Sequence, residues 1–507
     1  MIKDGPMAEN DDSVALATEG ARNENTLRFL KSGARGLYIG GRFVPSLSGK
    51  TFETVNPANE RRLAMVAEGG EADIDAAVAA ARKAFDRGPW PRMRPAERAK
   101  VLNRLADLVQ AHAEELAEID TLDSGLMITV TRAGAGGIAD SLRDAASWAN
   151  KVEGETYPTG PDNFSFSLRE PLGVCGIIIP WNGPAVLAAR KPGIALAVGN
   201  TVVLKPAEQT PLSALRLAEL ISESGFPEGV INIVTGFGVG AGSALANHRD
   251  VDAISFTGSA SVGKEIVKAS SENFKKVMLE LGGKSPHIIF ADVDLEKAVP
   301  NAAMGVFRNH GQMCFAGSRV FVQRDIYAEF AAEFARYAAA MKVASPWDTA
   351  ASIGPLVSAA QHERVTGYVD LGVREGARLA AGGKRNDGKG YYVNPTVFCN
   401  VNNSMRIARE EIFGPVASLI AFDTEEDAIR QGNDTVYGLG SGIWTRDVSR
   451  AIRVARQLRA GNVWINGYGM RNEMAPFGGY KHSGIGREGG KYSVEFYSEM
   501  KSVFVTI

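Results

Sequence analysis

The chain has 507 residues, with 45% apolar and 22% charged side chains and a formal net charge of −2. This length predicts two or three domains that share large interfaces. The near-neutral charge gives no reason to expect nucleic acid or an acidic membrane as a partner. We therefore expect the partners to be small molecules or further copies of the chain.

The three cysteines, Cys175, Cys314 and Cys399, lie far apart and fit no metal-ligand spacing. This spacing predicts no bound metal and a reducing compartment. No apolar run in the sequence approaches the roughly 20 residues that cross a bilayer, which predicts no membrane association. The N-terminal segment lacks the apolar core of a secretory signal and is too acidic for a transit peptide. We therefore expect a cytoplasmic protein.

The first elements are predicted from the pattern of apolar residues. Residues 1–33 are expected to form a mobile arm, with at most a short helix around "ENTLRFLKSG". The stretch "YIGGRFVP" then predicts a β-hairpin. Two amphipathic helices follow, one over residues 71–86 and one over residues 94–125, the second begun by Pro95 and stopped by Gly125.

Short buried strands alternate with helices between Leu172 and Phe256. This alternation predicts βαβ units and a parallel sheet that binds ligands at the carboxyl ends of its strands. A second set of strands, "SPHIIF", "RVFVQ", "YYVNPTVF" and "GNVWIN", predicts a second α/β domain. The fold class is therefore α/β with two parallel-sheet bodies.

Three features in the first set suggest a dinucleotide site. The segment "VLKPAEQTP" places Lys205 and Glu208 directly after a buried strand, where both can hydrogen-bond ribose hydroxyls. Taken alone, such a pair is more often an ion pair at the surface. The glycine-rich segments 236–242 and 256–263 also follow strands, and glycine lets the backbone approach a pyrophosphate at a helix N-terminus. Their succession favours the dinucleotide interpretation.

From about Leu37 to the C-terminus the chain resembles the aldehyde dehydrogenase superfamily. The motifs that carry the resemblance are "PWN" at 180–182, "KPAEQTP" at 205–211, "FTGS" at 256–259, "LELGGKSP" at 279–286, "GQMCFAGSR" at 311–319, "EEIFGPV" at 410–416 and "PFGGYKHSGIGRE" at 476–488. The resemblance implies a Rossmann-like cofactor domain (34–152 and 172–282), an α/β catalytic domain (283–490) and a β oligomerisation ribbon (153–171 and 491–507). It also implies a homodimer or homotetramer, with "FSFSLREPLG" pairing with "KSVFVTI".

The resemblance implies a hydrolytic, non-acylating enzyme in which Cys314 attacks the aldehyde. Glu280 would be the base that also activates water for thioester hydrolysis. Asn182 and the backbone N–H of Cys314 would bind the oxyanion, and Lys191 matches a lysine near the family's active site. A purely structural interpretation remains for three of these residues: Cys314 as an inert cysteine, Glu280 as a structural acid and Asn182 as a turn-forming residue. His310, beside the nucleophile, is interpreted as part of the loop structure.

The same resemblance implies NAD as the cofactor, with NADP as an alternative. Glu208 would repel a 2′-phosphate and so favour NAD. The implied cofactor-binding residues are Ile178, Pro180, Trp181, Lys205, Glu208, Gly238, Gly242, Phe256, Thr257, Gly258, Ser259, Val262, Leu281, Glu411 and Phe413.

Substrate choice is less specified. Arg190 and Arg471 stand where family members often carry tunnel aromatics, which favours a semialdehyde acid as the substrate. If they are instead ion pairs, a broad aromatic or aliphatic aldehyde is expected. Met313, Phe315 and Phe477 are the expected apolar contacts.

One further departure from the family pattern concerns proton transfer. Lys491 stands where some family members carry a glutamate that aids a proton relay. Two other functions also remain open at this stage. A coenzyme-A-acylating dehydrogenase tends to lack the base that Glu280 would provide, and a non-catalytic homologue would be expected to lose Cys314 or Glu280.

Overall fold

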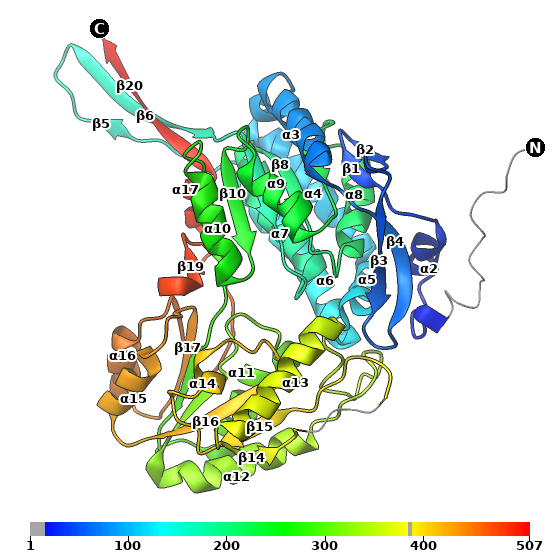
Figure 1. The fold of residues 1–507 in the computed structure, drawn as a ribbon. Helices are drawn as coiled ribbons and strands as arrows, with labels where there is room; N and C mark the ends of the chain where they lie inside the picture. Colours follow the sequence, from blue (N-terminus) through cyan, green and yellow to red (C-terminus); the bar gives the residue numbers. More distant parts are fainter. Residues whose placement is uncertain (1–15, 384–387) are drawn as a thin grey trace, which may run out of the picture.

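Two α/β bodies and a projecting β ribbon make up the chain (Figure 1). The computed structural model describes residues 16–383 and 388–507. The first body contains the blue-to-green part of the chain, and the second contains the yellow and orange part. The red C-terminal segment returns to the first body and then ends in the ribbon.

An eight-stranded sheet forms the centre of the first body, in the order β19, β11, β10, β7, β8, β9, β1, β2. Its five middle strands are parallel, and the predicted hairpin β1–β2 extends one edge in antiparallel fashion. Helices cover both faces, which explains why the middle strands read as continuous apolar runs. The strands are β1 (Leu37–Ile39), β2 (Arg42–Val44), β7 (Val174–Ile178), β8 (Thr201–Lys205), β9 (Ile231–Ile233), β10 (Ala253–Thr257), β11 (Lys276–Glu280) and β19 (Gly484–Ile485).

The helices of the first body include the two that lead toward the candidate site, α7 and α10. Helix α7 begins at Pro184, which suits a first helical turn, and ends before Gly199, whose φ of 113° caps it. A separate two-stranded sheet, β3 (Thr51–Asn56) and β4 (Arg61–Ala67), lies near the N-terminal helix α2. The helices are α2 (Glu24–Lys31), α3 (Glu71–Asp86), α4 (Pro95–Ala111), α5 (Ala113–Ser124), α6 (Ile128–Trp148), α7 (Pro184–Val198), α8 (Leu212–Ser224), α9 (Ser243–Asn247) and α10 (Ala260–Ser270).

The single helix predicted over residues 94–125 is wrong, because the chain breaks at His112 into α4 and α5. The His112 backbone leaves the helical region, and its ring bonds Glu115 at 2.8 Å. Apolar residues on both sides, such as Val109 and Leu116, pack into one core. The helical periodicity therefore continues across a bend that it does not reveal.

A seven-stranded sheet forms the second body, in the order β14, β15, β16, β13, β12, β17, β18, and only β14 is antiparallel. Apolar side chains of α11 and α12 pack on one face, and those of α13 to α16 pack on the other. The elements are α11 (Leu295–Phe307), α12 (Arg324–Ala340), α13 (Ala359–Arg374), α14 (Arg406–Arg409), α15 (Glu425–Asn433), α16 (Val448–Gln457), β12 (Pro286–Ile289), β13 (Arg319–Gln323), β14 (Arg378–Ala381), β15 (Thr396–Cys399), β16 (Val416–Phe422), β17 (Gly440–Trp444) and β18 (Asn462–Ile465).

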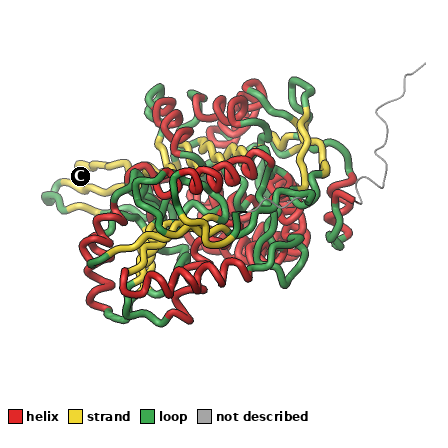
Figure 2. Tube along the Cα trace, turned by 60° about the horizontal axis from the view of Figure 1, so that its bottom comes forward, coloured by secondary structure: helices red, strands yellow, loops and turns green. Residues whose placement is uncertain are grey.

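The ribbon consists of β5 (Thr156–Tyr157), β6 (Asn163–Pro171) and β20 (Ser498–Thr506). Strand β20 pairs antiparallel with the whole of β6, which confirms the predicted pairing. The ribbon projects from the first body in both views (Figures 1 and 2). It carries strongly exposed apolar side chains, Phe504 and Ile507 among them.

The arm predicted over residues 1–33 does not match the structure from residue 16 onward. Phe29 and Leu30 of α2 are buried, and the Arg35 guanidinium lies 3.7 Å from the centre of the Phe29 ring. The Glu118 carboxylate accepts hydrogen bonds from the backbone of Arg22 and Asn23. A few well-placed apolar and capping contacts thus hold this segment on α5. Residues 1–15 lie outside the described part of the chain.

Two predicted domain boundaries also need correction near the C-terminus. Strand β19 falls in the range expected for the catalytic domain, yet it pairs with β11 of the first sheet. Helix α17 (Gly490–Phe496) falls in the range expected for the ribbon, yet it packs against α7. Residues 484–496 therefore complete the first body. Over the described residues, none of the helices has the length and apolarity needed to cross a membrane.

Candidate active site

A cavity of about 980 Å³ contains three of the predicted catalytic residues in its lining: Asn182, Glu280 and Cys314. They come from the loop after β7, the end of β11 and the loop after α11. A volume of this size suits a ligand site. The parallel sheet explains the convergence on the first-body side, since the carboxyl ends of β7 and β11 face the same edge.

The loop that carries Cys314 has an unusual backbone. Asn309 and His310 both have positive φ angles, 54° and 58°, and Gly311 follows at 71°. The His310 ring bonds the carbonyl oxygen of Pro355 at 2.9 Å, and burial lowers the pKa of His310 to about 4. His310 is thus tied to the neighbouring loop, in agreement with its interpretation as loop structure.

The thiol of Cys314 requires a base. Burial, followed by the charges of Glu280 and Glu411, raises its pKa to about 12. Glu280 is buried, and neither of its carboxylate oxygens has a hydrogen-bond partner among the described residues. Burial and then the nearby Glu488 raise the pKa of Glu280 well above its ordinary value. A carboxyl group in this state suits proton exchange near neutral pH.

The other two cysteines differ in setting. Cys175 and Cys399 have no exposed surface and lie in apolar clusters, whereas Cys314 is partly exposed. Burial raises the pKa of both thiols. Such cysteines behave as small apolar side chains.

Asn182 is linked to the nucleophile loop. Its side-chain amide donates to the carbonyl oxygen of Gln312 at 2.9 Å, and the Asn309 amide donates back to the Asn182 carbonyl at 3.1 Å. The two asparagines therefore join the loop after β7 to the loop that precedes Cys314.

Lys191 and Glu488 form a buried ion pair beside the cavity. The Lys191 ammonium also reaches the hydroxyl of Ser255 at 3.3 Å. Although burial acts to raise it, Lys191, Arg190 and Arg471 hold the pKa of Glu488 at about 2. Glu488 is the last residue of the motif "PFGGYKHSGIGRE", but the sequence alone indicated no role for its side chain.

Lys491 is not among the described residues that line the cavity. Its side chain is exposed, and its ammonium lies 5.4 Å from the centre of the Tyr492 ring. The acid that lines the cavity in this region is Glu488, three residues earlier. The motif could have shown this, because Glu488 ends it.

The two predicted substrate arginines both have acidic partners. Arg190 lies 3.7 Å from Glu488 and 4.0 Å from Glu473, and Arg471 lies 3.9 Å and 3.7 Å from the same two carboxylates. The Arg471 guanidinium also lies 4.5 Å from the centre of the Phe477 ring. The geometry therefore contains the ion pairs that the sequence left as the alternative.

An aromatic wall lines the far side of the nucleophile. The Phe315 ring centre lies 5.4 Å from that of Trp464 and 6.1 Å from that of Phe477, and all three line the cavity with Met313. The Tyr468 hydroxyl donates to the Phe315 carbonyl at 2.6 Å. The sequence predicted Trp464 only as part of the strand "GNVWIN". A strand pattern does not show which of its side chains will line a cavity.

The predicted ribose pair lies at the carboxyl end of β8. The Lys205 ammonium is 3.0 Å from the Glu208 carboxylate, and Lys205 is buried while Glu208 is partly exposed. Burial lowers the pKa of Lys205. Both residues precede α8 at the edge of the sheet that the sequence predicted.

The glycine segment 238–242 forms a short π-helix, and Gly238 has open space where a side chain would begin. Ser259 caps α10 by accepting from the Val262 N–H at 3.4 Å, and Phe256 and Thr257 end β10 just before it. Gly258 follows directly, so the predicted pyrophosphate segment does open a helix. The side chains of Ile178 and Leu281 instead pack into the core, so these two residues could contact a cofactor only through their backbone atoms.

Residues predicted for the nicotinamide side adjoin the same loops. The Glu411 carboxylate accepts from the Gly283 N–H at 3.0 Å, and burial raises the pKa of Glu411 to about 7. The Phe413 ring meets Trp181, which follows Pro180, edge-on at 5.1 Å between centres. Phe413 has a positive φ of 61°, so the local backbone is constrained.

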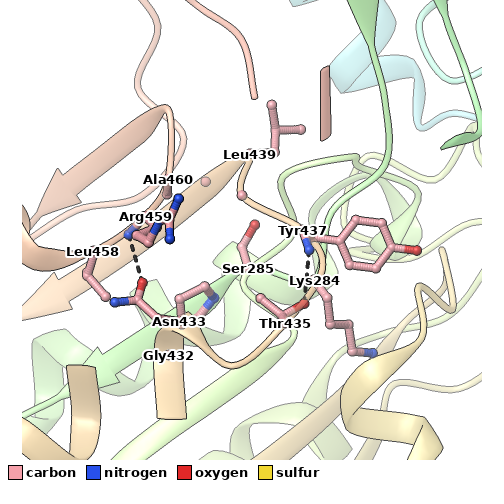
Figure 3. A pocket seen from close by; sticks show the side chains of 13 residues that line it. Lys284, Ser285, Gly432, Asn433, Thr435, Tyr437, Leu439, Leu458, Arg459 and Ala460 are labelled. Atoms are coloured by element: carbon pink, nitrogen blue, oxygen red, sulfur yellow. Dashed lines mark hydrogen bonds between the residues drawn. The ribbon is translucent and has the colours of Figure 1, made fainter. Parts of the chain in front are cut away.

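A second, small cavity lies in the second body, bordered by Lys284, Asn433 and Tyr437 (Figure 3). Its volume is about 10 Å³, enough for at most one water molecule. The Lys284 ammonium is buried without a partner among the residues described, and burial lowers its pKa to about 7. This cavity does not compete with the larger one as a substrate site.

The comparisons with known proteins decide the family. The model of the aldehyde dehydrogenase family matches residues 43–503. The chain belongs to the aldehyde dehydrogenase family. The sequence prediction of this family and of its α/β fold is thereby confirmed, and the chain is an oxidoreductase.

Individual relatives agree with this assignment. An aldehyde dehydrogenase of Emericella nidulans is 48% identical, with 92% of this chain and 94% of the relative covered. The NAD+ complex structure of aldehyde dehydrogenase from Bacillus cereus is 48% identical with a TM-score of 0.94, covering 96% of this chain and 99% of that one. A mutant of P. syringae AldA, an indole-3-acetaldehyde dehydrogenase, in complex with NAD+ and IAA is 44% identical, with a TM-score of 0.91 and coverage of 93% and 96%.

Proposed function

We propose that this aldehyde dehydrogenase oxidises an aldehyde to the carboxylic acid with NAD, by way of a thioester on Cys314 that water hydrolyses. The observation that carries the proposal is the presence of Cys314, Glu280 and Asn182 in the lining of one cavity. A thiol nucleophile, a carboxylate without a fixed partner and an amide donor are the groups that the reaction needs.

Glu280 takes the Cys314 proton, directly or through one water, and the thiolate adds to the carbonyl carbon. The resulting oxyanion receives hydrogen bonds from the Asn182 amide and the Cys314 backbone N–H. One such donor contributes roughly 3–4 kcal/mol to the transition state. To serve there, the Asn182 amide must exchange its bond to Gln312, which lies in the same loop.

Bound NAD would supply the hydride acceptor for the tetrahedral carbon that Cys314 holds. Glu280 first releases the Cys314 proton to solvent and then takes a proton from water, whose oxygen bonds to the thioester carbon while the Cys314 thiolate leaves and the acid forms. After burial, which is the largest influence, the charges of Glu488 and Lys191 both act on the proton affinity of Glu280. Lys191 is therefore assigned an electrostatic role.

The residues present fit NAD. An ammonium and a carboxylate, Lys205 and Glu208, can bond ribose hydroxyls, and the open backbone at Gly238 and the start of α10 suit a pyrophosphate. Glu411, whose carboxylate accepts from the Gly283 N–H, has the acceptor oxygens for the second ribose. The Bacillus cereus and P. syringae relatives, both described with NAD+, support this choice.

Assembly and location are part of the same proposal. Strand β20 leaves a β edge and exposed apolar side chains on the ribbon, which suits a homodimer or homotetramer. The three cysteines are free thiols in the structure, which supports a reducing, cytoplasmic location.

The test is an NADH assay against a panel of aldehydes, with and without coenzyme A. We expect acid and NADH in equal amounts without coenzyme A. A strict requirement for coenzyme A would support the acylating alternative, and no turnover with any aldehyde would support a non-catalytic role. Analytical ultracentrifugation of the same preparation measures the oligomeric state.

A further inference from the structure

Arg308 is a cavity-lining cation that the reaction described above does not use. It follows α11 and begins the loop that carries the nucleophile, six positions before Cys314. Its side chain is exposed. A side chain built at Gly469 would begin 3.3 Å from the Phe315 ring and 3.8 Å from a guanidinium nitrogen of Arg308. The Arg308 guanidinium thus lies beside the aromatic wall.

Arg308 differs from the other two arginines that line the cavity. Arg190 and Arg471 each lie within 4.0 Å of Glu473 and Glu488. In the part of the chain that the structure describes, the guanidinium of Arg308 makes no ion pair or hydrogen bond. Its planar set of donors is therefore available to a ligand.

The acids around the cavity do not compensate this charge. Glu488 is already matched by Lys191, Arg190 and Arg471. Burial raises the pKa of Asp120 to about 7 and that of Glu280 well above its ordinary value, which favours their neutral forms. Arg308 is thus a cation in the cavity lining that has no paired carboxylate among the described residues.

The rest of the lining fixes the kind of molecule that this cation would hold. An apolar surface lines the same cavity, formed by Val186, Leu187, Phe315, Trp464 and Phe477. A substrate that fits has an apolar or aromatic body, an aldehyde at one end and an anion at the other. A carboxylate matches the fork of a guanidinium with two parallel hydrogen bonds.

We propose that Arg308 selects aldehydes that carry a carboxylate at the end remote from the reacting carbonyl. The inference rests on the proposed function and names its substrate class. It transfers the predicted acid-binding role from Arg190 and Arg471, which already have carboxylate partners, to an arginine that the sequence had not singled out.

The experiment compares 4-formylbenzoate with 4-formylbenzamide, a neutral molecule of nearly the same shape, and succinate semialdehyde with its amide. Wild-type enzyme should prefer each acid over its amide by roughly tenfold or more in kcat/KM. Arg308→Gln should bring this ratio close to one and leave the amide nearly unaffected. Arg308→Lys should keep part of the ratio, because it retains the charge without the fork.

Two controls sharpen the result. Arg249→Gln removes an exposed arginine on the surface of the first body, 4.0 Å from the Glu272 carboxylate and outside the cavity lining, and it should leave the ratio unchanged. Raising the salt concentration should lower the wild-type ratio, since the contact is partly exposed. Thermal unfolding of each variant establishes that the fold is retained.

The outcomes separate the inference from the reaction itself. A wild-type ratio near one, a ratio that survives Arg308→Gln, or equal loss with acid and amide would each overturn the role of Arg308 while leaving aldehyde oxidation in place. Loss of the ratio in Arg471→Gln but not in Arg308→Gln would return the role to Arg471. If neither aldehyde of a pair is oxidised, both the inference and the proposed function fail.

Discussion

The buried ammonium of Lys191 bonds the carboxylate of Glu488, although the two residues stand 297 positions apart in the chain. Both side chains are nearly free of solvent exposure. The two charges have opposite effects on the pKa of Glu280, because Glu488 raises it and Lys191 lowers it. The pair therefore acts on the proposed base through its charges.

Replacing Glu488 by Gln should move the acid limb of the kcat/KM–pH profile to lower pH. The reason is that a negative charge near Glu280 is lost, so the pKa of Glu280 falls. The measurement uses a neutral aldehyde across the pH range in which the enzyme is stable. Glu473→Gln is the matched control, because Glu473 is not among the charges that shift Glu280. An acid limb that moves to higher pH in Glu488→Gln would contradict the electrostatic role of Glu488.

The same variant should also change stability with a defined pH dependence. The pKa of Glu488 is about 2 in the folded protein, below the unfolded value of about 4.3. Its stabilising effect is therefore fully present above about pH 4.3 and is lost as pH falls toward 2. Glu488→Gln should cost about 3 kcal/mol at neutral pH, with a smaller difference from wild type near pH 3. Urea unfolding at both pH values measures this, and an equal cost at both would argue against the ion pair.

Cys314→Ala should lower NADH production at least about a thousandfold, because it removes the nucleophile and leaves the rest of the site in place. Cofactor binding, followed by fluorescence titration, should remain within about twofold of wild type. Cys399→Ala is the matched control in the same body and should retain turnover. Substantial activity in the Cys314 variant would disprove the thioester route.

Glu280→Gln keeps the shape of the side chain and removes the base. Thioester hydrolysis should slow by about a hundredfold or more, and a burst of NADH can survive if acylation is slowed less. Rapid-mixing kinetics distinguish the two phases. Unchanged turnover would transfer the base to another group, and His310 would be the next residue to replace.

Glu208→Gln should shift cofactor choice by about tenfold toward NADP, because it removes a negative charge that repels the 2′-phosphate. The ratio of kcat/KM values for NAD and NADP measures the shift. Glu223→Gln, on the exposed surface of α8, is the control. If the wild-type enzyme has equal kcat/KM values for NADP and NAD, Glu208 does not discriminate between the two cofactors.

The sequence predicted those parts of the fold in which local pattern and tertiary environment agree. Strands β7 to β10 are buried on both faces, so their apolar runs are unambiguous, and Gly199 ends α7 where the pattern ends. It did not predict the bend at His112, because the apolar stripe of α4 continues into α5. Nor did it place β19 and α17 in the first body, since this depends on pairing with distant segments.

The candidate site shows the same division. Cys314, Glu280 and Asn182 stand in motifs, and the cavity contains all three. Glu488, Trp464 and Arg308 were missed or given no role because their importance depends on which groups they meet. A carboxylate next to a buried lysine and an arginine without an acid partner cannot be recognised from spacing along the chain.

The return of the C-terminal segment has a consequence for biosynthesis. Translation delivers Cys314 and Glu280 long before Glu488, so a nascent chain holds the nucleophile and base while Lys191 still lacks its counter-charge. Strand β6 likewise waits for β20, which is translated much later. Domains generally fold as they emerge, but the first body is complete only when β19 and α17 have been translated. A premature stop codon shortly before Glu488 would therefore yield a protein that carries its nucleophile and base but not the ion pair beside them.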